Sequence, residues 1–457
     1  MKVRLFTIAA VLFPLWATAQ RLSVDINNWQ FSRDQQHWQQ VKVPHDWAIA
    51  GPFDKKWDLQ YVAIAQNGET EKTEKSGRSG ALPWIGRGYY RTHIDGTRLQ
   101  GKRVVLAFDG AMADPHVFVN GKEAGRWAYG YNAFRINITP FIKPGNNLIE
   151  VNLNNLEESS RWHPGGGIYR PVHLIATSPT AIDDWSVFCH TISANDKEAV
   201  LGVSAALTDS SNQKLTYTLK DCQGHTVASA EGTGQLSLRV ANPKLWSPDH
   251  PYLYTLTVAY NDGGRCRDAY SLKTGIRTLT IGKEGVRLNG RPLPIKGVCL
   301  HHDLGPLGAA VNKAAIIRQV NILKDMGANA IRTSHNMPSQ TQMQVYDSLG
   351  IVVMAESFDM WLYPKCQNGY ARLFKDWADR DITNLVLANR NHPSLIMYSI
   401  GNEIPEQWSD EGREIARHLQ DICHRLDPTR MVTQGMDRPD DALKSGFAQV
   451  MDIPGFN

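Results

Sequence analysis

The sequence predicts a multidomain protein in which two β-sandwiches precede an incomplete (β/α)8 barrel. Short apolar strands alternate with turn residues up to residue 277, and strands alternate with amphipathic helices after Thr278. Polar side chains directly follow the later strands, as they do at the mouth of a barrel. At 457 residues the chain has room for about two to four domains of roughly 100–200 residues each.

The first predicted domain, residues 20–177, has the strand–turn–strand pattern of an all-β sandwich. Asn120-Gly121 lies between two β-rich runs, and both residue types tolerate the positive φ of a two-residue hairpin turn. The predicted strands include the runs "RVVLAFDG", "PHVFVNGKEAGR", "FRINITPFI", "KPGNNLIEVNL" and "GGIYRPVHLIAT".

The second predicted domain, residues 178–277, has the strand spacing of an immunoglobulin-like β-sandwich. Its strands include "EAVLGVSAAL", "LTYTLKD" and "YLYTLTVAY". Few of its residues carry useful chemistry, so we expect a structural role.

The third predicted domain, residues 278–457, combines continuous apolar strands with helices, which indicates a parallel sheet covered on both faces. A doubly wound sheet is the alternative, but it more often has a Gly-rich phosphate loop, and none is found. The polar residues at the strand ends favour a barrel: His301, His302, Ser334, His335, Glu356, Asn402, Glu403 and Asn457.

Only six barrel strands can be counted before Asn457, whereas a closed barrel has eight. We therefore expect a natural truncation or a fragment of a longer protein. Six strands leave two sheet edges with unpaired main-chain groups, and we expect these edges to favour association with another copy or with a complementing C-terminal segment.

Residues 1–19 have the pattern of a secretory signal peptide. Lys2 and Arg4 precede the apolar run Leu5 to Trp16, and small residues up to Ala19 suit a signal peptidase. An uncleaved anchor is the alternative, but the run is shorter than the roughly 20 residues that span a bilayer, and Pro14 interrupts it. We expect an exported protein, periplasmic or extracellular, without membrane insertion.

The charge and cysteine patterns exclude two classes of partner. A formal charge of +4 with no basic, aromatic-rich stripe argues against nucleic acid. The six cysteines are widely spaced without a C-x-x-C pair, which argues against a zinc site and leaves any disulfide pairing open.

The segment "YSIGNEIPEQ", Tyr398 to Gln407, contains the main catalytic candidate. Glu403 follows an apolar strand, a setting in which a carboxyl group can hold a proton near neutral pH and donate it to a leaving group. The alternative is an exposed glutamate in a loop between strand and helix.

Several motifs in order resemble glycoside hydrolase family 2, which includes β-galactosidases, β-glucuronidases and β-mannosidases. The resemblance covers nearly all of the chain after the signal and implies that the first sandwich is a sugar-binding jelly roll. The motifs are "VPHDWAIAGPF", "GRGYYRTHI", "VFVNGKEAG", "SSRWHPGGGIYRPVHL", "LWSPDHPYLYTLTV", "TGIRTL", "LNGRPLPIKGVCLHHD", "MGANAIRTSHNMPS", "IVVMAESFDMW" and "NRNHPSLIMYSIGNEIPEQ".

The resemblance implies that Glu403 is the general acid/base and that Asn402 hydrogen-bonds the sugar 2-hydroxyl, a contact that strengthens in the transition state. It also implies that Arg332 and His335 line the sugar subsite. For Arg332, a buried structural ion pair is an equal alternative.

Asp359 and Trp361 follow the third barrel strand and suit a sugar, because its C–H face stacks on an aromatic ring and its hydroxyls donate to a carboxylate. The alternative for Trp361 is a buried anchor of its own loop. We expect polar-network or packing roles for Glu356, His301, His302, Asp46 and Trp162. We find no ligand set for a metal and expect no cofactor.

The family's nucleophile, a second Glu after the seventh strand, has no counterpart here. Glu406, Glu411 and Glu414 follow Glu403 but belong to the next loop and helix. The sequence thus predicts a retaining β-glycoside hydrolase, most similar to a β-galactosidase, that lacks its nucleophile and is inactive alone. The alternatives are β-glucuronidase specificity, a non-catalytic carbohydrate-binding protein, and one part of a split enzyme.

Overall fold

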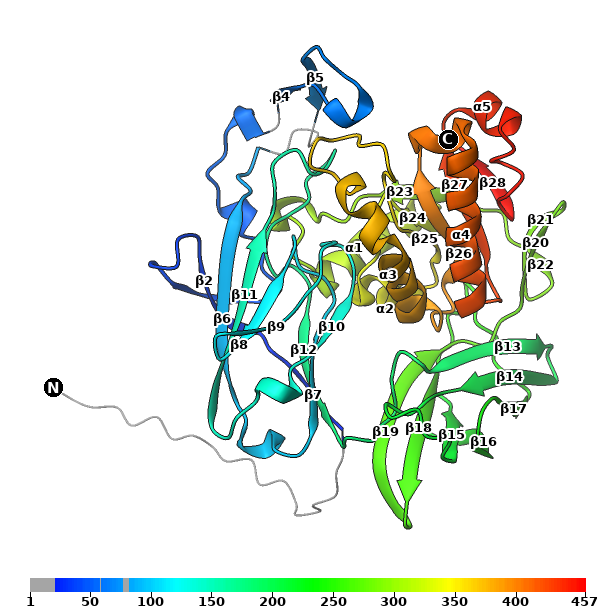
Figure 1. Cartoon of the computed structure of the whole chain (residues 1–457). Helices are drawn as coiled ribbons and strands as arrows, with labels where there is room; N and C mark the ends of the chain where they lie inside the picture. The colour runs from blue at the N-terminus through cyan, green and yellow to red at the C-terminus, as the bar shows by residue number, and fades with distance from the viewer. Residues whose placement is uncertain (1–20, 58, 77–81) are drawn as a thin grey trace.

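The computed structural model describes residues 21–57, 59–76 and 82–457, so the predicted signal, residues 1–19, lies outside the described residues. Figure 1 shows two β-sandwich domains beside a domain of helices and parallel strands. The predicted fold class, including the incomplete barrel, is confirmed.

The first domain consists of two antiparallel sheets packed face to face over one apolar core. The turn after Val119 has positive φ at Asn120 (52°) and Gly121 (78°), as the sequence predicts. One sheet has the order β1 (Leu22–Asp25), β12 (Val172–Thr177), β7 (Arg103–Phe108), β10 (Phe134–Asn137). The other has the order β3 (Gln39–Lys42), β2 (Asn28–Ser32), β6 (Arg87–Asp95), β11 (Asn146–Asn154), β8 (His116–Val119), β9 (Lys122–Arg126).

A hairpin of β4 (Leu59–Val62) and β5 (Thr73–Ser76) projects from this domain toward the barrel. Between its strands, Asn67 Nδ2 donates a hydrogen bond to the main-chain oxygen of Pro364, a barrel residue, at 2.8 Å.

The immunoglobulin-like domain has its own core between two sheets. The first sheet has the order β13 (Phe188–Ala194), β14 (Glu198–Ser204), β17 (Leu236–Ala241). The second has the order β16 (Thr226–Gly232), β15 (Leu215–Lys220), β18 (Tyr254–Asp262), β19 (Arg265–Thr274). A small sheet that the sequence did not reveal follows, formed by β20 (Leu279–Gly282), β21 (Gly285–Leu288) and β22 (Arg291–Pro292).

The barrel sheet is entirely parallel, and its neighbours follow chain order. Its fourth strand is buried at every position, in agreement with its apolar sequence. The strands are β23 (Gly297–Leu300), β24 (Ala330–Thr333), β25 (Val352–Glu356), β26 (Leu395–Asn402), β27 (Met431–Met436) and β28 (Ile453–Phe456). Among the residues described, β23 and β28 are the sheet edges and do not pair with each other.

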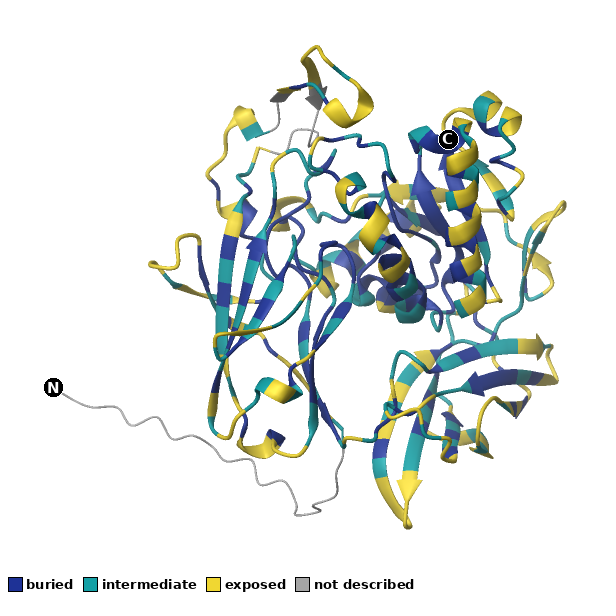
Figure 2. Cartoon of the chain, viewed as in Figure 1, coloured by how far each residue is buried: buried dark blue, intermediate teal, exposed yellow. Residues whose placement is uncertain are grey.

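The barrel helices begin and end at sequence signals. Ser339 and Gln342 form a reciprocal capping box before the second helix, and Gly350 ends it in the left-handed conformation. Figure 2 shows α4 with a buried face toward the sheet and an exposed outer face. The helices are α1 (Lys313–Asp325), α2 (Gln340–Leu349), α3 (Ala371–Asn389), α4 (Asp410–Leu426) and α5 (Pro439–Lys444).

Short 3-10 helices complete the described fold: η1 (Trp47–Ala50), η2 (Lys55–Trp57), η3 (Ala65–Asn67), η4 (Thr97–Leu99), η5 (Thr139–Phe141), η6 (Gly305–Leu307) and η7 (Pro405–Trp408). All six cysteines are unpaired. No helix within the described ranges is both long and apolar enough to cross a membrane.

The jelly roll and the barrel share one apolar core. Met112, Tyr129, Tyr131 and Trp162 of the jelly roll belong to the same buried cluster as the barrel side chains. Arg170 Nη2 also donates to the main-chain oxygen of Met337 at 2.7 Å. The mouth of the barrel is therefore built against the jelly roll.

Candidate active site

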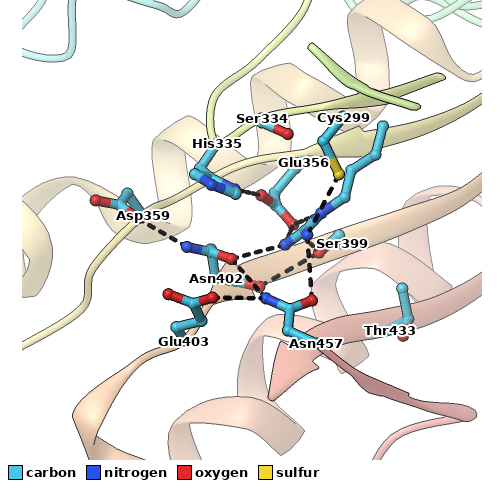
Figure 3. Close-up of polar contacts among 12 residues, drawn as sticks. Cys299, Ser334, His335, Glu356, Asp359, Ser399, Asn402, Glu403, Thr433 and Asn457 are labelled. Atoms are coloured by element: carbon cyan, nitrogen blue, oxygen red, sulfur yellow. Dashed lines mark hydrogen bonds and ion pairs between the residues drawn. The ribbon is translucent and has the colours of Figure 1, made fainter. Parts of the chain in front are cut away.

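Glu356, at the end of β25, is the centre of a buried polar network at the barrel mouth (Figure 3). Its carboxylate accepts hydrogen bonds from Arg332 Nε (2.8 Å), His335 Nδ1 (2.6 Å) and Ser399 Oγ (2.6 Å). Arg332 Nη2 lies 2.7 Å from the same carboxylate. Burial lowers the pKa of Arg332, but the Glu356 charge outweighs this and raises the pKa overall. The expected place of Glu356 in an internal network agrees with this geometry.

The amide of Asn402 is held from both sides. Arg332 Nη2 donates to Asn402 Oδ1 at 2.8 Å, and Asn402 Nδ2 donates to Asp359 Oδ1 at 3.0 Å. These two bonds fix which end of the amide is the donor. Asn457 Nδ2 donates to the same Asn402 oxygen at 3.1 Å and covers the amide, which is fully buried.

The backbone turns away from the strand at Glu403, immediately after β26. The Glu403 φ of 45° lies in the left-handed region, which is sparsely populated by residues other than glycine. The main-chain N–H of Glu403 donates to the Gly435 oxygen at 2.7 Å and stabilises this turn. The side chain is half-buried, and its Oε1 accepts a hydrogen bond from Asn457 Nδ2 at 3.0 Å (Figure 3).

Asp359 forms ion pairs with two basic side chains whose roles the sequence did not predict. Arg161, from the jelly roll, forms a two-point ion pair with it, and Lys365 Nζ lies 3.2 Å from its Oδ1. Burial raises the pKa of Asp359, but these partners and Asn402 outweigh it and lower the pKa overall. Arg161 in "SSRW" contacts Asp359 in "SFDMW", which belongs to another domain. A single sequence does not show that two such distant segments meet, so the role of Arg161 could not be predicted.

Lys365 also donates to the main-chain oxygen of Asn402 at 2.7 Å. Its ammonium therefore links Asp359 to the residue before Glu403. Burial lowers the pKa of Lys365 despite the attraction of Asp359.

Trp361 is fully buried, and its indole Nε1 donates to the Ile400 oxygen at 3.0 Å. Its ring packs near Phe374 and Phe447. No face of the ring is open to a sugar, so the expected stacking role is corrected to that of a buried loop anchor.

Aromatic rings pack around His335 at the mouth. Trp162 lies 5.7 Å and His301 lies 5.5 Å from the His335 ring, measured between centroids. His302 is buried and contacts the His163 main-chain oxygen, and burial lowers its pKa to about 3. Asp46 accepts hydrogen bonds from main-chain groups of both domains, which suits domain docking.

Glu406 cannot reach a substrate in this structure. It is fully buried, and its Oε1 accepts hydrogen bonds from the main-chain N–H groups of Leu362 (2.6 Å) and Tyr363 (2.8 Å). Burial raises the pKa of its carboxyl group. No group of three or more His, Cys, Asp or Glu among the described residues is arranged to hold a metal ion.

An Asn-Glu pair at a strand end of a parallel barrel, behind two β-sandwiches, is the layout of a multidomain glycoside hydrolase. The chain belongs to glycosyl hydrolases family 2. It matches that family's sugar binding domain over residues 15–178, the family 2 domain over residues 180–277 and the TIM barrel domain over residues 279–451.

Named relatives and solved structures agree with this assignment. The β-galactosidase BoGH2A of Bacteroides ovatus is 37% identical over 92% of this chain and 53% of its own length. A β-glucuronidase of Bacteroides fragilis is 28% identical over 94% of this chain and 63% of its own. A crystal structure of a family 2 member from Bacteroides cellulosilyticus aligns with a TM-score of 0.86 at 33% identity, over 96% of this chain and 58% of that one. The chain spans about half the length of BoGH2A.

Proposed function

We propose that this chain is the acid/base-bearing part of a retaining β-glycoside hydrolase that acts on terminal β-galactosides. One observation carries the proposal: Glu403, half-buried at the end of β26, lies beside an amide whose orientation Arg332 and Asp359 fix. The similarity to a named β-galactosidase supports the sugar, and that to a named β-glucuronidase makes glucuronides the second candidate.

The proposed mechanism is double displacement without a cofactor. Glu403 protonates the glycosidic oxygen as the nucleophile attacks the anomeric carbon, and it later deprotonates the incoming water. The sugar 2-hydroxyl takes the place of the Asn457 amide, which hydrogen-bonds both Asn402 and Glu403 in this structure.

We place the nucleophile outside these 457 residues, on a complementing C-terminal segment. Glu356 forms an ion pair with Arg332, and Asp359 forms one with Arg161. Glu406 is buried and accepts hydrogen bonds from main-chain N–H groups. None of these carboxylates is left free to attack a sugar.

Azide rescue tests this proposal. The chain alone should not hydrolyse an aryl β-galactoside, but added azide can replace a missing nucleophile and attack the anomeric carbon while the aryl oxygen leaves. The expected product is the α-galactosyl azide, because a single displacement inverts the configuration. With a poorly acidic leaving group, Glu403→Gln should lower this rate by about 100-fold or more.

Two results would overturn the assignment. Hydrolysis without azide that is lost in Glu403→Gln would show that the nucleophile lies within the chain. Absence of both rescue and binding of D-galactose would favour another function. Parallel assays with the aryl β-glucuronide decide between the two sugars.

We also propose export by the predicted signal of residues 1–19. Expression in a bacterial host and N-terminal sequencing of the released protein should give a mature chain that begins at Gln20. An intact Met1 in the cytoplasmic fraction would contradict export.

A further inference from the structure

A cavity of about 280 Å³, partly open to solvent, lies at the junction of the immunoglobulin-like domain and the barrel. It lies beside the beginning of β26, whereas Glu403 follows the end of the same strand. Its lining includes His190, Arg277, Thr278, Thr280 and Arg430. The cavity is therefore separate from the candidate active site.

Arg277 brings a positive charge to this cavity without a negative partner. Its guanidinium donates to the main-chain oxygens of Pro393 and Leu395, both at 2.5 Å, and among the described residues no carboxylate lies within ion-pair distance. Burial lowers the pKa of Arg277 to about 9, and the nearby Arg430 adds to this.

Arg430, by contrast, is neutralised locally. Its Nη1 lies 2.6 Å from Asp427 Oδ2, and its other nitrogens donate to main-chain oxygens of Leu395 and His392. Asp427 and Asp347 also attract the charge of Arg277, but neither lies within ion-pair distance of it. Of the two arginines, only Arg430 therefore has a carboxylate partner in direct contact among the described residues.

The remaining lining offers further unused polar atoms. His190 Nδ1 is buried without a hydrogen-bond partner in the described part of the chain. Thr278 and Thr280 also line the cavity, Thr280 at an exposed position, and their hydroxyl groups form no hydrogen bond with another described residue. Buried polar atoms are normally satisfied, so the unpaired His190 Nδ1 points to a bound species.

We propose that this cavity binds a small oxyanion, phosphate or sulfate, which neutralises Arg277 and links the immunoglobulin-like domain to the barrel. A guanidinium with free N–H groups forms charge-assisted hydrogen bonds with such oxygens. The site is independent of sugar cleavage and does not rest on the proposed function.

Isothermal titration of the full chain with phosphate and, separately, with sulfate tests this site, with ionic strength kept constant by NaCl. We expect saturable binding of at least one of the two anions at one site per chain. Arg277→Gln should weaken it about tenfold or more, as expected for loss of a charge-assisted hydrogen bond.

Arg390→Gln is the matched control. Arg390 holds the same domain junction through the main-chain oxygens of Leu426, Trp185 and Ser186 but does not line the cavity. Its loss should leave anion affinity unchanged.

A second variant is needed because Arg277→Gln could weaken anion binding by disturbing the contact between the two domains. Thr280 is exposed at the cavity rim, so Thr280→Glu should retain the fold and place a competing carboxylate near Arg277. We expect it to weaken anion binding about tenfold as well. Absence of saturable binding of both anions, or equal losses in Arg277→Gln and Arg390→Gln, would overturn the proposal.

Discussion

Arg161 of the jelly roll and Asp359 of the barrel form a two-point ion pair, with Nε–Oδ2 at 2.8 Å and Nη2–Oδ1 at 2.5 Å. Asp359 Oδ1 also accepts the hydrogen bond from Asn402 Nδ2. The sugar-binding amide proposed for the barrel is therefore oriented by the jelly roll through one carboxylate.

Arg161→Gln should destabilise the protein by about 2 kcal/mol, because it leaves the buried Asp359 with only one cation. Urea unfolding measures this loss. Arg239→Gln, which breaks an exposed pair with Glu198, is the control and should cost less than about 1 kcal/mol. Equal losses of unfolding free energy in the two variants would show that the interdomain pair contributes no more than an exposed pair.

Trp361→Phe should lower the free energy of unfolding by about 2–3 kcal/mol, because it removes buried volume and the hydrogen bond to the Ile400 oxygen. Trp408→Phe is the control at an exposed position and should change stability by less than about 0.5 kcal/mol. A variant that keeps its stability but loses galactose affinity would restore the stacking role.

Gly435→Ala should disturb the site directly. A Cβ at this position would lie 2.6 Å from Arg332 Nη2 and 3.0 Å from the Asn457 amide, so Arg332 must shift away from Asn402. We expect a loss of about 1–3 kcal/mol in stability and about tenfold in the azide-dependent rate. Gly282→Ala, where no atom lies within 4 Å of the added Cβ, should leave the rate unchanged.

Asp381 of α3 should make stability depend on pH. It accepts hydrogen bonds from Trp127 Nε1 (2.9 Å) and Asn132 Nδ2 (2.8 Å) of the jelly roll and from the Tyr370 hydroxyl. Burial raises its pKa to about 7, although these three donors lower it in part. The folded protein therefore keeps this proton up to about pH 7, whereas the unfolded chain releases it near pH 4.

Between these two values the folded state binds more protons, so the free energy of unfolding falls as pH rises. The contribution of Asp381 should decrease by about 2–3 kcal/mol from pH 5 to pH 7 and stay constant above. Urea unfolding of Asp381→Asn should lack this part of the slope. Parallel curves for the two proteins would contradict the raised pKa.

The sequence predicted that Glu356, Asn402 and Glu403 lie at one edge, because each follows or ends an apolar strand of a parallel sheet. Arg332 was expected at the site only through the family resemblance. The sequence did not reveal Arg161, because a contact between residues 198 positions apart leaves no local pattern. For Trp361 the sequence left sugar stacking and burial as alternatives, since an aromatic residue after a strand can face either the mouth or the core.

The segment after β25 and the segment after β26 are joined at several points. The main-chain N–H of Asn402 donates to the Phe358 oxygen, Lys365 holds the Asn402 oxygen, and Glu406 accepts from the N–H groups of Leu362 and Tyr363. A redesign of the site must therefore exchange residues 358–365 and 402–406 together, and the new segments must include a carboxylate that pairs with Arg161.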